Sequence, residues 1–382
     1  MTGPLVIASM MRAHGATGVQ THVNAVRAKF AELGRKPLLV TPFDLSPAFF
    51  YPVFGVRRLL EPAMPAVGVW WHRYWHAWFL RRALRGVLAQ LGPCVLYAQC
   101  PLSAWAALYA RASPRQRVVM AVHFNVSQAD EWADKGMIKR GGSFFRAIEV
   151  FESMILPRLD GLVFVSDFMR RELHRRIPEL CRVQSAVTPN FLIDPGFRVQ
   201  SDLHSDLITV GTLEYRKNQR YALEIVAAAK AVGHRLTLTI VGGGPDRAML
   251  ESLTKEWNIT DQVRFTGAVA NAAGLMSAHR AYLHVARMEN LCIVIIEAMA
   301  RGLPVFAPEV GGIPEIFKDG SEGRIVTLAD AAIAAEQVTS WLKDPEMMRR
   351  AGTAARERYL MHFEANQVAP DLLAFLDEVG AK

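Results

Sequence analysis

Short apolar runs alternate with longer amphipathic stretches along the whole chain. The runs are rich in valine, isoleucine and leucine, as in "LVIASM" near the start and "DLITVG" after residue 205. Buried parallel strands have this continuous apolar character, and the stretches between them suit helices with one apolar face. The pattern predicts parallel sheets built from βαβ units, with strands at 5–10, 37–42, 94–99, 117–124, 161–166, 206–211, 235–244, 262–267, 281–286 and 304–308.

The repeated pattern breaks between residues 190 and 206, where proline, glycine and polar residues are typical of a linker. Because 382 residues are too many for one hydrophobic core, we predict two doubly wound α/β domains, 1–192 and 193–360. The remaining segment, 361–382, is expected to be a helix that could pack back on the first domain. In such folds ligands bind outside the carboxyl ends of the strands, here in a cleft between the domains.

Charge is unevenly distributed along the chain. The formal net charge is +8, but residues 1–192 contain 24 of the 44 basic residues and only 12 of the 36 acidic residues. A basic first half implies a polyanionic partner, such as nucleic acid, anionic lipid headgroups or a phosphorylated substrate. A hydrophobic share of 51% and a charged share of 21% indicate a globular chain and exclude a largely disordered one.

The four cysteines, Cys94, Cys100, Cys181 and Cys292, have no CxxC spacing, so we expect reduced thiols and a cytoplasmic protein. The first apolar run lacks a basic leader and a cleavage site, which favours a strand over a signal peptide. No apolar run reaches the roughly 18 residues of a membrane span. We find no DxD at a strand end, no cluster of histidine and cysteine, and no GxSxG, so the sequence favours neither metal nor nucleophilic catalysis.

Residues 66–91 combine aromatic and basic side chains, including half of the eight tryptophans. Such a helix fits an element at a membrane interface, and it also fits a buried packing helix with a basic outer end. The basic excess of the first half favours the membrane. The residues concerned are Trp70, Trp71, Trp75, Trp78, Arg81, Arg82 and Arg85.

Other candidate residues stand where strands are expected to end. Gly18 precedes a helix whose first amides could face a phosphate or a sugar. Arg216 and Lys217 lie close to a helix start, where two cations suit a diphosphate, although a solvated surface pair has the same pattern. His123 ends the strand at 117–124, either as a structural residue or as a group that faces a ligand.

The segment "ENLCIVIIEAMARGLPVFAPEVGGIPEI" holds two carboxylates eight positions apart, Glu289 and Glu297. With "VGTLEYRKN", "IVGGGP", "VRFTGAV" and "DGSEG", and with "HGATGVQTHV", "VHFN", "FVSDFMRREL" and "VTPN" in the first half, it resembles glycosyltransferase family 4. The resemblance covers most of the chain. It implies the GT-B fold, two Rossmann-like domains facing across a cleft, and a retaining enzyme with a nucleotide-sugar donor.

The same resemblance implies roles for individual residues. Glu297, at the start of its helix, would accept hydrogen bonds from the donor ribose, and Glu289 would face the sugar and stabilise oxocarbenium-like charge. Arg216 and Lys217 would neutralise the nucleoside diphosphate in place of a metal ion, so no metal cofactor is expected. Gly18 would allow a close approach of donor phosphates or acceptor, and His123 would contact the transferred sugar. The loop amides at the sugar would be those of Asn290, Leu291, Cys292 and Ile293.

Position 292 departs from the family pattern, since relatives frequently have glycine or proline where this chain has Cys292. The variants "GTLEYRKN" and "ENLCIVIIEAMA" resemble bacterial mannosyltransferases that extend a polyprenyl-diphosphate-linked cellobiose in acetan and xanthan assembly. This implies GDP-mannose as donor, a lipid-linked glycan as acceptor, and a peripheral position at the inner face of the cell membrane. UDP-glucose or UDP-GlcNAc would use the same scaffold.

Three other functions are compatible with parts of this sequence. An NAD-dependent oxidoreductase needs a GxGxxG after the first strand, which "HGATGV" does not match. A nucleic-acid binder would suit the charge, but no recognition motif supports it, so no nucleic-acid partner is expected. A non-catalytic subunit that only holds a nucleotide sugar stays open.

Overall fold

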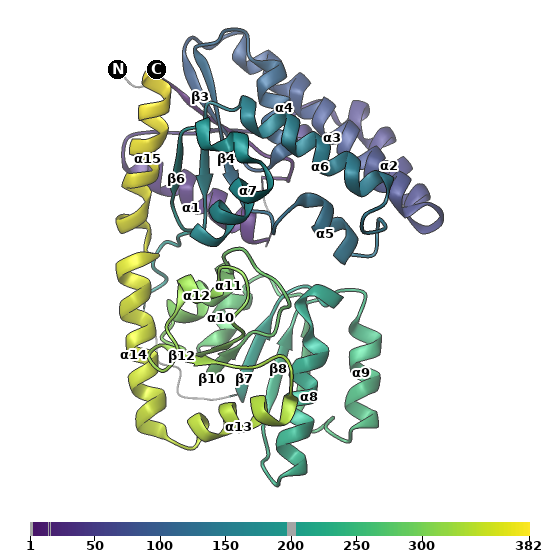
Figure 1. The fold of residues 1–382 in the computed structure, drawn as a ribbon, viewed down its shortest axis with the longest axis vertical. Helices are drawn as coiled ribbons and strands as arrows, with labels where there is room; N and C mark the ends of the chain where they lie inside the picture. Colours follow the sequence, from purple (N-terminus) through teal and green to yellow (C-terminus); the bar gives the residue numbers. More distant parts are fainter. Residues whose placement is uncertain (1–2, 14, 16, 197–203) are drawn as a thin grey trace. The chain divides into compact units, whose positions relative to one another are not determined.

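The computed structural model describes residues 3–13, 15, 17–196 and 204–382. The chain forms two compact units, the first made of Met1–Asn190 with Val368–Lys382 and the second of Phe191–Gln367. Each unit contains one six-stranded parallel sheet (Figure 1). The predicted boundaries were 192 and 360, whereas the chain passes between the units at 190 and again at 367.

The sheet of the first unit has the order β2-β1-β3-β4-β5-β6, and all neighbouring strands are parallel. The central strands are almost completely buried, which explains their unbroken apolar sequences. The strands are β1 (Leu5–Ala8), β2 (Leu38–Val40), β3 (Cys94–Ala98), β4 (Gln116–Val122), β5 (Gly161–Phe164) and β6 (Ser185–Val187).

The helices of the first unit connect these strands. The first of them begins at a capping box, in which the Thr17 hydroxyl accepts a hydrogen bond from the amide of Gln20. The α-helices are α1 (Gly18–Glu32), α2 (Pro47–Ala63), α3 (Pro65–Leu88), α4 (Pro101–Ala110), α5 (Gln128–Asp134), α6 (Ser143–Ile155) and α7 (Asp167–Arg176), with 3-10 turns η1 (Pro42–Asp44), η2 (Leu156–Arg158) and η3 (Pro178–Arg182).

The sheet of the second unit has the order β12-β11-β10-β7-β8-β9, again with all neighbours parallel. The prediction of two parallel α/β domains is therefore confirmed. The strands are β7 (Ser205–Val210), β8 (Leu238–Val241), β9 (Val263–Gly267), β10 (His279–Leu283), β11 (Val305–Ala307) and β12 (Gly323–Ile325).

The helices of the second unit pack around that sheet, and α8 and α13 contribute much of its apolar core. One short helix, α11, carries the second half of the "ENLCIVIIE" segment. The elements are η4 (Tyr215–Lys217), α8 (Gln219–Ala231), α9 (Arg247–Glu256), α10 (Ala272–Met276), α11 (Ile293–Met299), α12 (Ile313–Ile316), α13 (Ala331–Leu342) and α14 (Pro345–His362).

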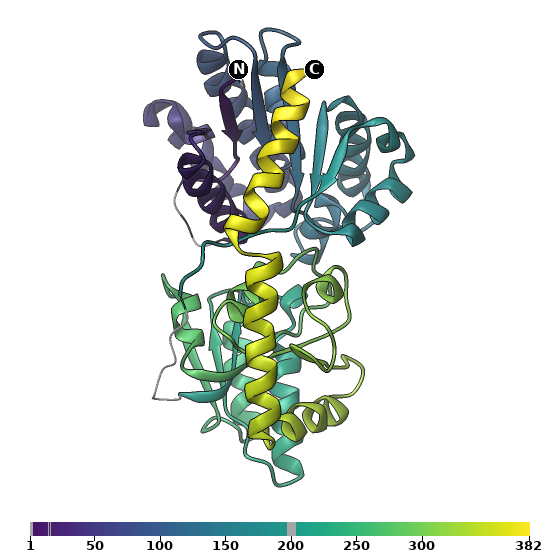
Figure 2. The same ribbon diagram turned by 90° about the vertical axis from the view of Figure 1, so that its left-hand side faces the viewer.

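The last helix, α15 (Ala365–Ala381), lies across one face of the first sheet, as the yellow helix in Figure 2 shows. It approaches β5 so closely that a Cβ on Gly161 would lie 3.2 Å from Val379 and 3.4 Å from Phe375. An ion pair of 2.8 Å joins Asp377 of this helix to Arg35. The chain end is therefore part of the first unit, although it follows the second in sequence.

Helices α2 and α3 form an antiparallel pair at the side of the first sheet (Figure 1). A proline at the first position of α3, Pro65, starts the new helix directly after α2 ends. The ring of Phe54 on α2 stacks on His76 of α3 with centroids 3.8 Å apart. Within the described part of the chain, no helix is both long enough and apolar enough to cross a membrane.

Candidate functional site

The candidate residues of the second half gather at the carboxyl edge of the second sheet. There β7 and β10 are neighbours, although β8 and β9 come between them in the chain. Open α/β sheets bind ligands at such a switch point. The loop after β7 carries Arg216 and Lys217, and the loop after β10 carries Glu289. The structure thus brings these three residues together.

Glu289 lies in the middle of this group. Its side chain is only 9% exposed, and Lys217 donates a hydrogen bond to its Oε1. The guanidinium of Arg216 lies 3.7 Å from Oε2, and Nε2 of His284 lies 3.3 Å from Oε1. Basic groups on several sides balance the buried carboxylate and hold it in one orientation.

Burial and the contacts between these side chains determine the pKa values in this group. Burial alone would raise the pKa of Glu289, but Lys217, His284 and Arg216 together lower it well below its usual value. Burial would lower the pKa of Lys217, yet the contact with Glu289 outweighs it and the pKa is raised. Burial would also lower the pKa of His284, but the neighbouring Cys292 and Glu289 outweigh burial and raise that pKa to about 9. Near neutral pH the ionised carboxylate of Glu289 therefore faces the cations of Lys217 and Arg216, with the ring of His284 also in contact.

Several hydrogen bonds join the loop after β7 to the loop after β10. Asn218, which follows η4, has a left-handed backbone with φ 57°, a conformation that asparagine adopts more readily than most residues. Its side-chain amide donates to the carbonyl of Val285 at 3.1 Å. The amide of Arg287 donates to the carbonyl of Arg216 at 3.0 Å. These contacts place the two cations over the carboxylate.

The glycine pair after β11 supports the backbone of Glu289. Gly311 has a φ of +58°, and a Cβ there would lie 1.8 Å from the carbonyl oxygen of Glu289. The amide of Gly312 donates to that same carbonyl at 3.0 Å. Only glycine combines this backbone angle with so close an approach.

We expect Gly311→Ala to lower the free energy of unfolding of the second unit by about 2 to 4 kcal/mol, because the new methyl group must push the Glu289 backbone away. Thermal unfolding followed by circular dichroism measures the effect. Gly243→Ala is the matched control, since a Cβ there meets no atom within 4 Å. Equal melting temperatures for the two variants would contradict this account.

The second carboxylate, Glu297, lies on α11. That helix begins at Ile293, so Glu297 is one turn inside the helix and not at its start as expected. Burial raises the pKa of Glu297 to about 7, and Arg301 opposes this rise only in part. The four predicted loop residues between the glutamates are all buried: Asn290, Leu291, Cys292 and Ile293.

The candidate residues of the first half lie at the carboxyl edge of the first sheet. Gly18 is the first residue of α1, and His123 directly follows β4. Nε2 of His123 lies 3.1 Å from Oε1 of Gln99, and burial lowers the pKa of His123 to about 4, so the ring is neutral near pH 7. Its ring packs edge-on against His22 with centroids 4.9 Å apart. His22 was not predicted from the sequence, although it follows Gly18 by one helical turn on the same face.

The tryptophans of α3 divide between two sides of the helix. Trp71 and Trp75 are half-buried, and the indole of Trp71 donates a hydrogen bond to the carbonyl of Val53 on α2 at 2.8 Å. Trp70 and Trp78, by contrast, are exposed. One side of this helix therefore packs against the first unit and the other faces outward, and a role at a membrane stays a prediction.

An exposed aromatic stripe, defined as Trp70, Tyr74 and Trp78, follows the outer face of α3. Steps of four residues keep the three side chains on one face, and their exposed fractions are 50%, 55% and 37%. Sequence analysis missed Tyr74, although its spacing from the two tryptophans was a usable signal. The predicted arginines come next along the helix, with Arg81 half-buried and Arg82 and Arg85 exposed.

A cluster of one histidine, one glutamate and one cysteine lies at the edge of the second sheet. The sequence shows no cluster of histidine and cysteine, but in the structure ligand atoms of His284, Glu289 and Cys292 all lie within 4.8 Å of one another. Their spacing, H-x4-E-x2-C, matches no common zinc pattern. The backbone must turn between β10 and α11 to bring the three side chains together, and sequence spacing does not reveal that turn.

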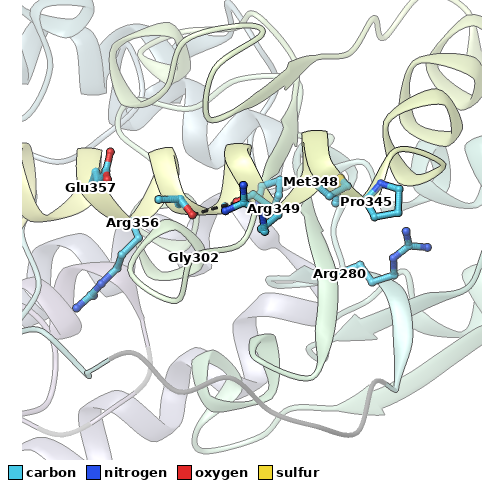
Figure 3. A pocket seen from close by; sticks show the side chains of 10 residues that line it. Arg280, Gly302, Pro345, Met348, Arg349, Arg356 and Glu357 are labelled. Carbon is cyan, nitrogen blue, oxygen red and sulfur yellow. Dashed lines mark hydrogen bonds between the residues drawn. The ribbon is translucent and has the colours of Figure 1, made fainter.

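A pocket of about 580 Å³ lies elsewhere in the second unit, beside α14 (Figure 3). Its lining includes Arg280 and Pro304, at the amino ends of β10 and β11. Arg280 is paired with Asp206 at 3.0 Å, and Arg356 is paired with Asp194. Open α/β sheets bind ligands at the carboxyl ends of their strands, and this pocket lies at the amino ends of β10 and β11, so we place the functional site at the charged group on the carboxyl edge.

Two family models match the chain and together cover most of it. Residues 16–192 match the model described as Glycosyltransferase Family 4. Residues 202–358 match the model described as Glycosyl transferases group 1. The second match contains every residue of the group around Glu289.

Individual proteins show the same similarity over shorter stretches. The N-acetyl-alpha-D-glucosaminyl L-malate synthase of Bacillus anthracis is 33% identical over 165 residues, which are 43% of this chain and 43% of that protein. The GDP-mannose-dependent alpha-(1-6)-phosphatidylinositol monomannoside mannosyltransferase of Mycobacterium tuberculosis is 32% identical over 166 residues, 40% of this chain and 43% of that protein. The similar stretch thus spans less than half the length of either relative.

The fold recurs in solved structures at lower identity. The sucrose-phosphate synthase of Thermosynechococcus elongatus superimposes with a TM-score of 0.76 at 20% identity, covering 99% of each chain. This likeness confirms the predicted GT-B fold. The two family models, the related sequences and the shared fold together support a GT-B glycosyltransferase family for this chain.

Proposed function

We propose that the protein is a retaining hexosyltransferase that binds a nucleotide-sugar donor at the carboxyl edge of the second sheet. The observation that supports this most is the buried, ionised Glu289 held against Lys217 and Arg216. Such a group offers a carboxylate to a sugar and two cations to a diphosphate. The matched family models support the same chemistry.

In the proposed reaction, the bond between the anomeric carbon and the diphosphate breaks as the acceptor oxygen bonds to that carbon, and the proton of the acceptor hydroxyl passes to the leaving diphosphate. Positive charge grows on the sugar ring and negative charge on the leaving diphosphate. Glu289 stabilises the first, and Arg216 and Lys217 stabilise the second. Because these groups are fixed by the fold, they need little reorganisation during the reaction. Two protein cations also supply the charge that a divalent metal provides in other enzymes, so the proposed reaction is metal-independent.

Glu297 is proposed to accept hydrogen bonds from the donor ribose. Its pKa of about 7 means that the free protein holds much of it protonated near neutral pH. Ribose hydroxyls favour the carboxylate, so donor affinity should fall as the pH drops below about 7, by up to about tenfold per pH unit. Calorimetric titration with GDP-mannose from about pH 6 to about pH 8 measures this, and Glu297→Gln should remove the slope. A slope that persists in the variant would refute the assignment.

For the transferred sugar we propose mannose, from GDP-mannose, and for the acceptor a polyprenyl-diphosphate-linked glycan. The mannosyltransferase relative uses GDP-mannose and a phosphatidylinositol mannoside, so a related site accepts both this donor and a lipid-borne acceptor. The basic first half of the chain suits an acceptor with a diphosphate. The protein would then work at the inner face of the cell membrane.

The aromatic stripe is proposed to hold the first unit on an anionic bilayer. Tryptophan and tyrosine favour the membrane interface, and each nearby arginine adds about 1 kcal/mol of attraction to anionic lipid. We expect the triple variant Trp70→Ser, Tyr74→Ser, Trp78→Ser to bind phosphatidylserine vesicles at least about tenfold more weakly in a sedimentation assay. Val150→Ser with Met154→Ser, two exposed positions on α6, is the control. Unchanged binding by the stripe variant would rule out this role.

Transfer of radiolabel tests the donor and the acceptor together. GDP-mannose, UDP-glucose and UDP-GlcNAc would each be offered with a chelator and a membrane extract that contains polyprenyl-diphosphate oligosaccharides. We expect only GDP-mannose to label the lipid fraction. Labelling from a UDP-sugar would replace the proposed donor while leaving the site in place. No labelling from any donor, with donor binding intact, would favour a subunit that only holds a nucleotide sugar.

A further inference from the structure

His284, Glu289 and Cys292 present an imidazole, a carboxylate and a thiol to one point in the second unit. We propose that they form a zinc site, where Zn²⁺ binds in place of the Lys217 ammonium and prevents donor binding. Thiolate, imidazole and carboxylate are the side-chain ligands that zinc uses in proteins. The site itself follows from the geometry of the cluster, and only its inhibitory effect rests on the proposed function.

The distances from His284 to the other two ligand atoms match a tetrahedral zinc ion. With roughly 2.0 Å from zinc to nitrogen or oxygen and roughly 2.3 Å to sulfur, tetrahedral neighbours lie roughly 3.3 Å apart for nitrogen and oxygen and roughly 3.5 Å apart for nitrogen and sulfur. In the structure, Nε2 of His284 lies 3.3 Å from Oε1 of Glu289. The same nitrogen lies 3.7 Å from Sγ of Cys292. Zinc could therefore enter without a large movement of these side chains, and its binding would release the protons of the Cys292 thiol and the His284 ring to solvent.

The orientation of His284 also suits a metal ligand. Nδ1, the ring nitrogen that would not bind zinc, lies 3.3 Å from the hydroxyl of Tyr282. Tyr282 is fully buried on β10, so its own position is fixed. A partner on the second nitrogen is the usual means by which proteins orient a zinc-binding histidine. Cys292 is fixed in turn as the residue that precedes the first turn of α11.

Lys217 contacts the same carboxylate oxygen of Glu289 that zinc would bind. Its ammonium donates to Oε1 of Glu289, the oxygen that faces His284. Zinc and the ammonium would repel each other at this distance, so binding of one displaces the other. With zinc bound, Glu289 would be a metal ligand and Lys217 would leave the diphosphate. Zinc and the sugar donor would therefore compete.

Cobalt(II) provides a direct test of the site, because tetrahedral cobalt with a thiolate ligand absorbs in the visible and near-ultraviolet ranges. We expect one equivalent of Co²⁺ to produce these bands in the wild-type protein, and added Zn²⁺ to remove them. Cys181→Ser, which changes an exposed thiol of the first unit, should behave like the wild type. Cys292→Ser should lose the thiolate band, and His284→Gln should bind Co²⁺ at least about tenfold more weakly. No band in the wild type, or an unchanged band in Cys292→Ser, would overturn the proposal.

A second variant separates a lost site from a lost fold. Lys217→Gln removes the competing ammonium, so we expect it to bind Co²⁺ more tightly than the wild type by at least about threefold. Circular dichroism would show whether each variant is folded. Weaker binding by a folded Lys217→Gln would overturn the claim that zinc and this ammonium compete.

The inhibitory effect is measured separately in the transfer assay. Zn²⁺ should raise the apparent KM for the donor at least about tenfold in the wild type and in Cys181→Ser. In Cys292→Ser, whatever its own activity, the KM with and without Zn²⁺ should agree. If cobalt binds as expected and no sugar is transferred, the zinc site stands and the proposed function fails. If sugar transfer is insensitive to Zn²⁺, the inhibitory role is overturned.

Discussion

Glu289→Gln is expected to lower kcat by roughly 10² to 10³ while donor affinity changes only severalfold. The amide has nearly the shape of the carboxylate but carries no charge to stabilise the sugar ring in the transition state. The loss should appear in kcat because Glu289 is proposed to matter most when charge develops, whereas Arg216 and Lys217 still hold the diphosphate. Single-turnover transfer of label and calorimetric donor binding, measured on the same protein, separate the two effects.

Glu309→Gln is the control for this variant. Glu309 is an exposed carboxylate in the loop after β11, at the same edge of the sheet. Its replacement should leave both kcat and donor affinity within about twofold, as expected for a surface position. Wild-type turnover in Glu289→Gln would remove the proposed catalytic role. Loss of donor binding without a separate loss of turnover would make Glu289 a binding residue only.

Lys217→Ala is expected to weaken donor binding by roughly 10²-fold, because a charge-assisted contact to the diphosphate is lost. It should also lower the free energy of unfolding by about 2 to 3 kcal/mol, since Glu289 stays buried with one cation fewer. The effect should fall below that of an isolated buried pair because Arg216 and His284 remain near the carboxylate. Donor titration and urea unfolding measure the two quantities.

The difference in unfolding free energy between wild type and Lys217→Ala should change with pH, in a direction that follows from the pKa of Glu289. In the wild type the pKa of Glu289 is held below its ordinary value of 4.5, so its stabilising effect is present above that pH and is lost as the pH falls through the lowered pKa. Without Lys217 that pKa should rise. The difference between wild type and variant should therefore be largest near neutral pH and shrink in acid. A difference that grows as the pH falls would contradict the ion pair.

Arg220→Ala is the matched control for Lys217→Ala. Arg220 lies in the first turn of α8, close in sequence to Lys217, but it is 60% exposed and pairs with Glu224 on the surface. Surface pairs of this kind contribute about 0 to 1 kcal/mol. We expect donor affinity and stability to stay near wild type. A loss equal to that of Lys217→Ala would mean that total charge at this edge matters and the contact with Glu289 does not.

The ten strands predicted from apolar runs all correspond to strands of the structure, because buried parallel strands leave a continuous apolar signal. Two strands were missed, β6 and β12. Each is only three residues long and lies at the edge of its sheet, where most positions are half-buried or exposed. Such strands have no apolar run to detect, and their place depends on the neighbouring strand.

The site was predictable only in part. Arg216, Lys217 and Glu289 could be chosen because each follows a predicted strand or belongs to a specific motif, and parallel strands end at one edge. The contacts between these residues could not be predicted, because they depend on how the loops after β7 and β10 turn. The contacts of His284 and Cys292 with Glu289 depend on the same turns, so they could not be predicted either. Residue order alone does not encode which side chains a turn brings within 4 Å.

A crystal structure of the protein grown with GDP-mannose tests the location of the donor site most directly. We predict the diphosphate within hydrogen-bonding distance of Arg216 and Lys217, with the ribose hydroxyls on Glu297 and the sugar at Glu289. Donor density at any other place, for example in the pocket beside α14 that Arg280 lines, would contradict the central claim that the charged group at the carboxyl edge is the donor site.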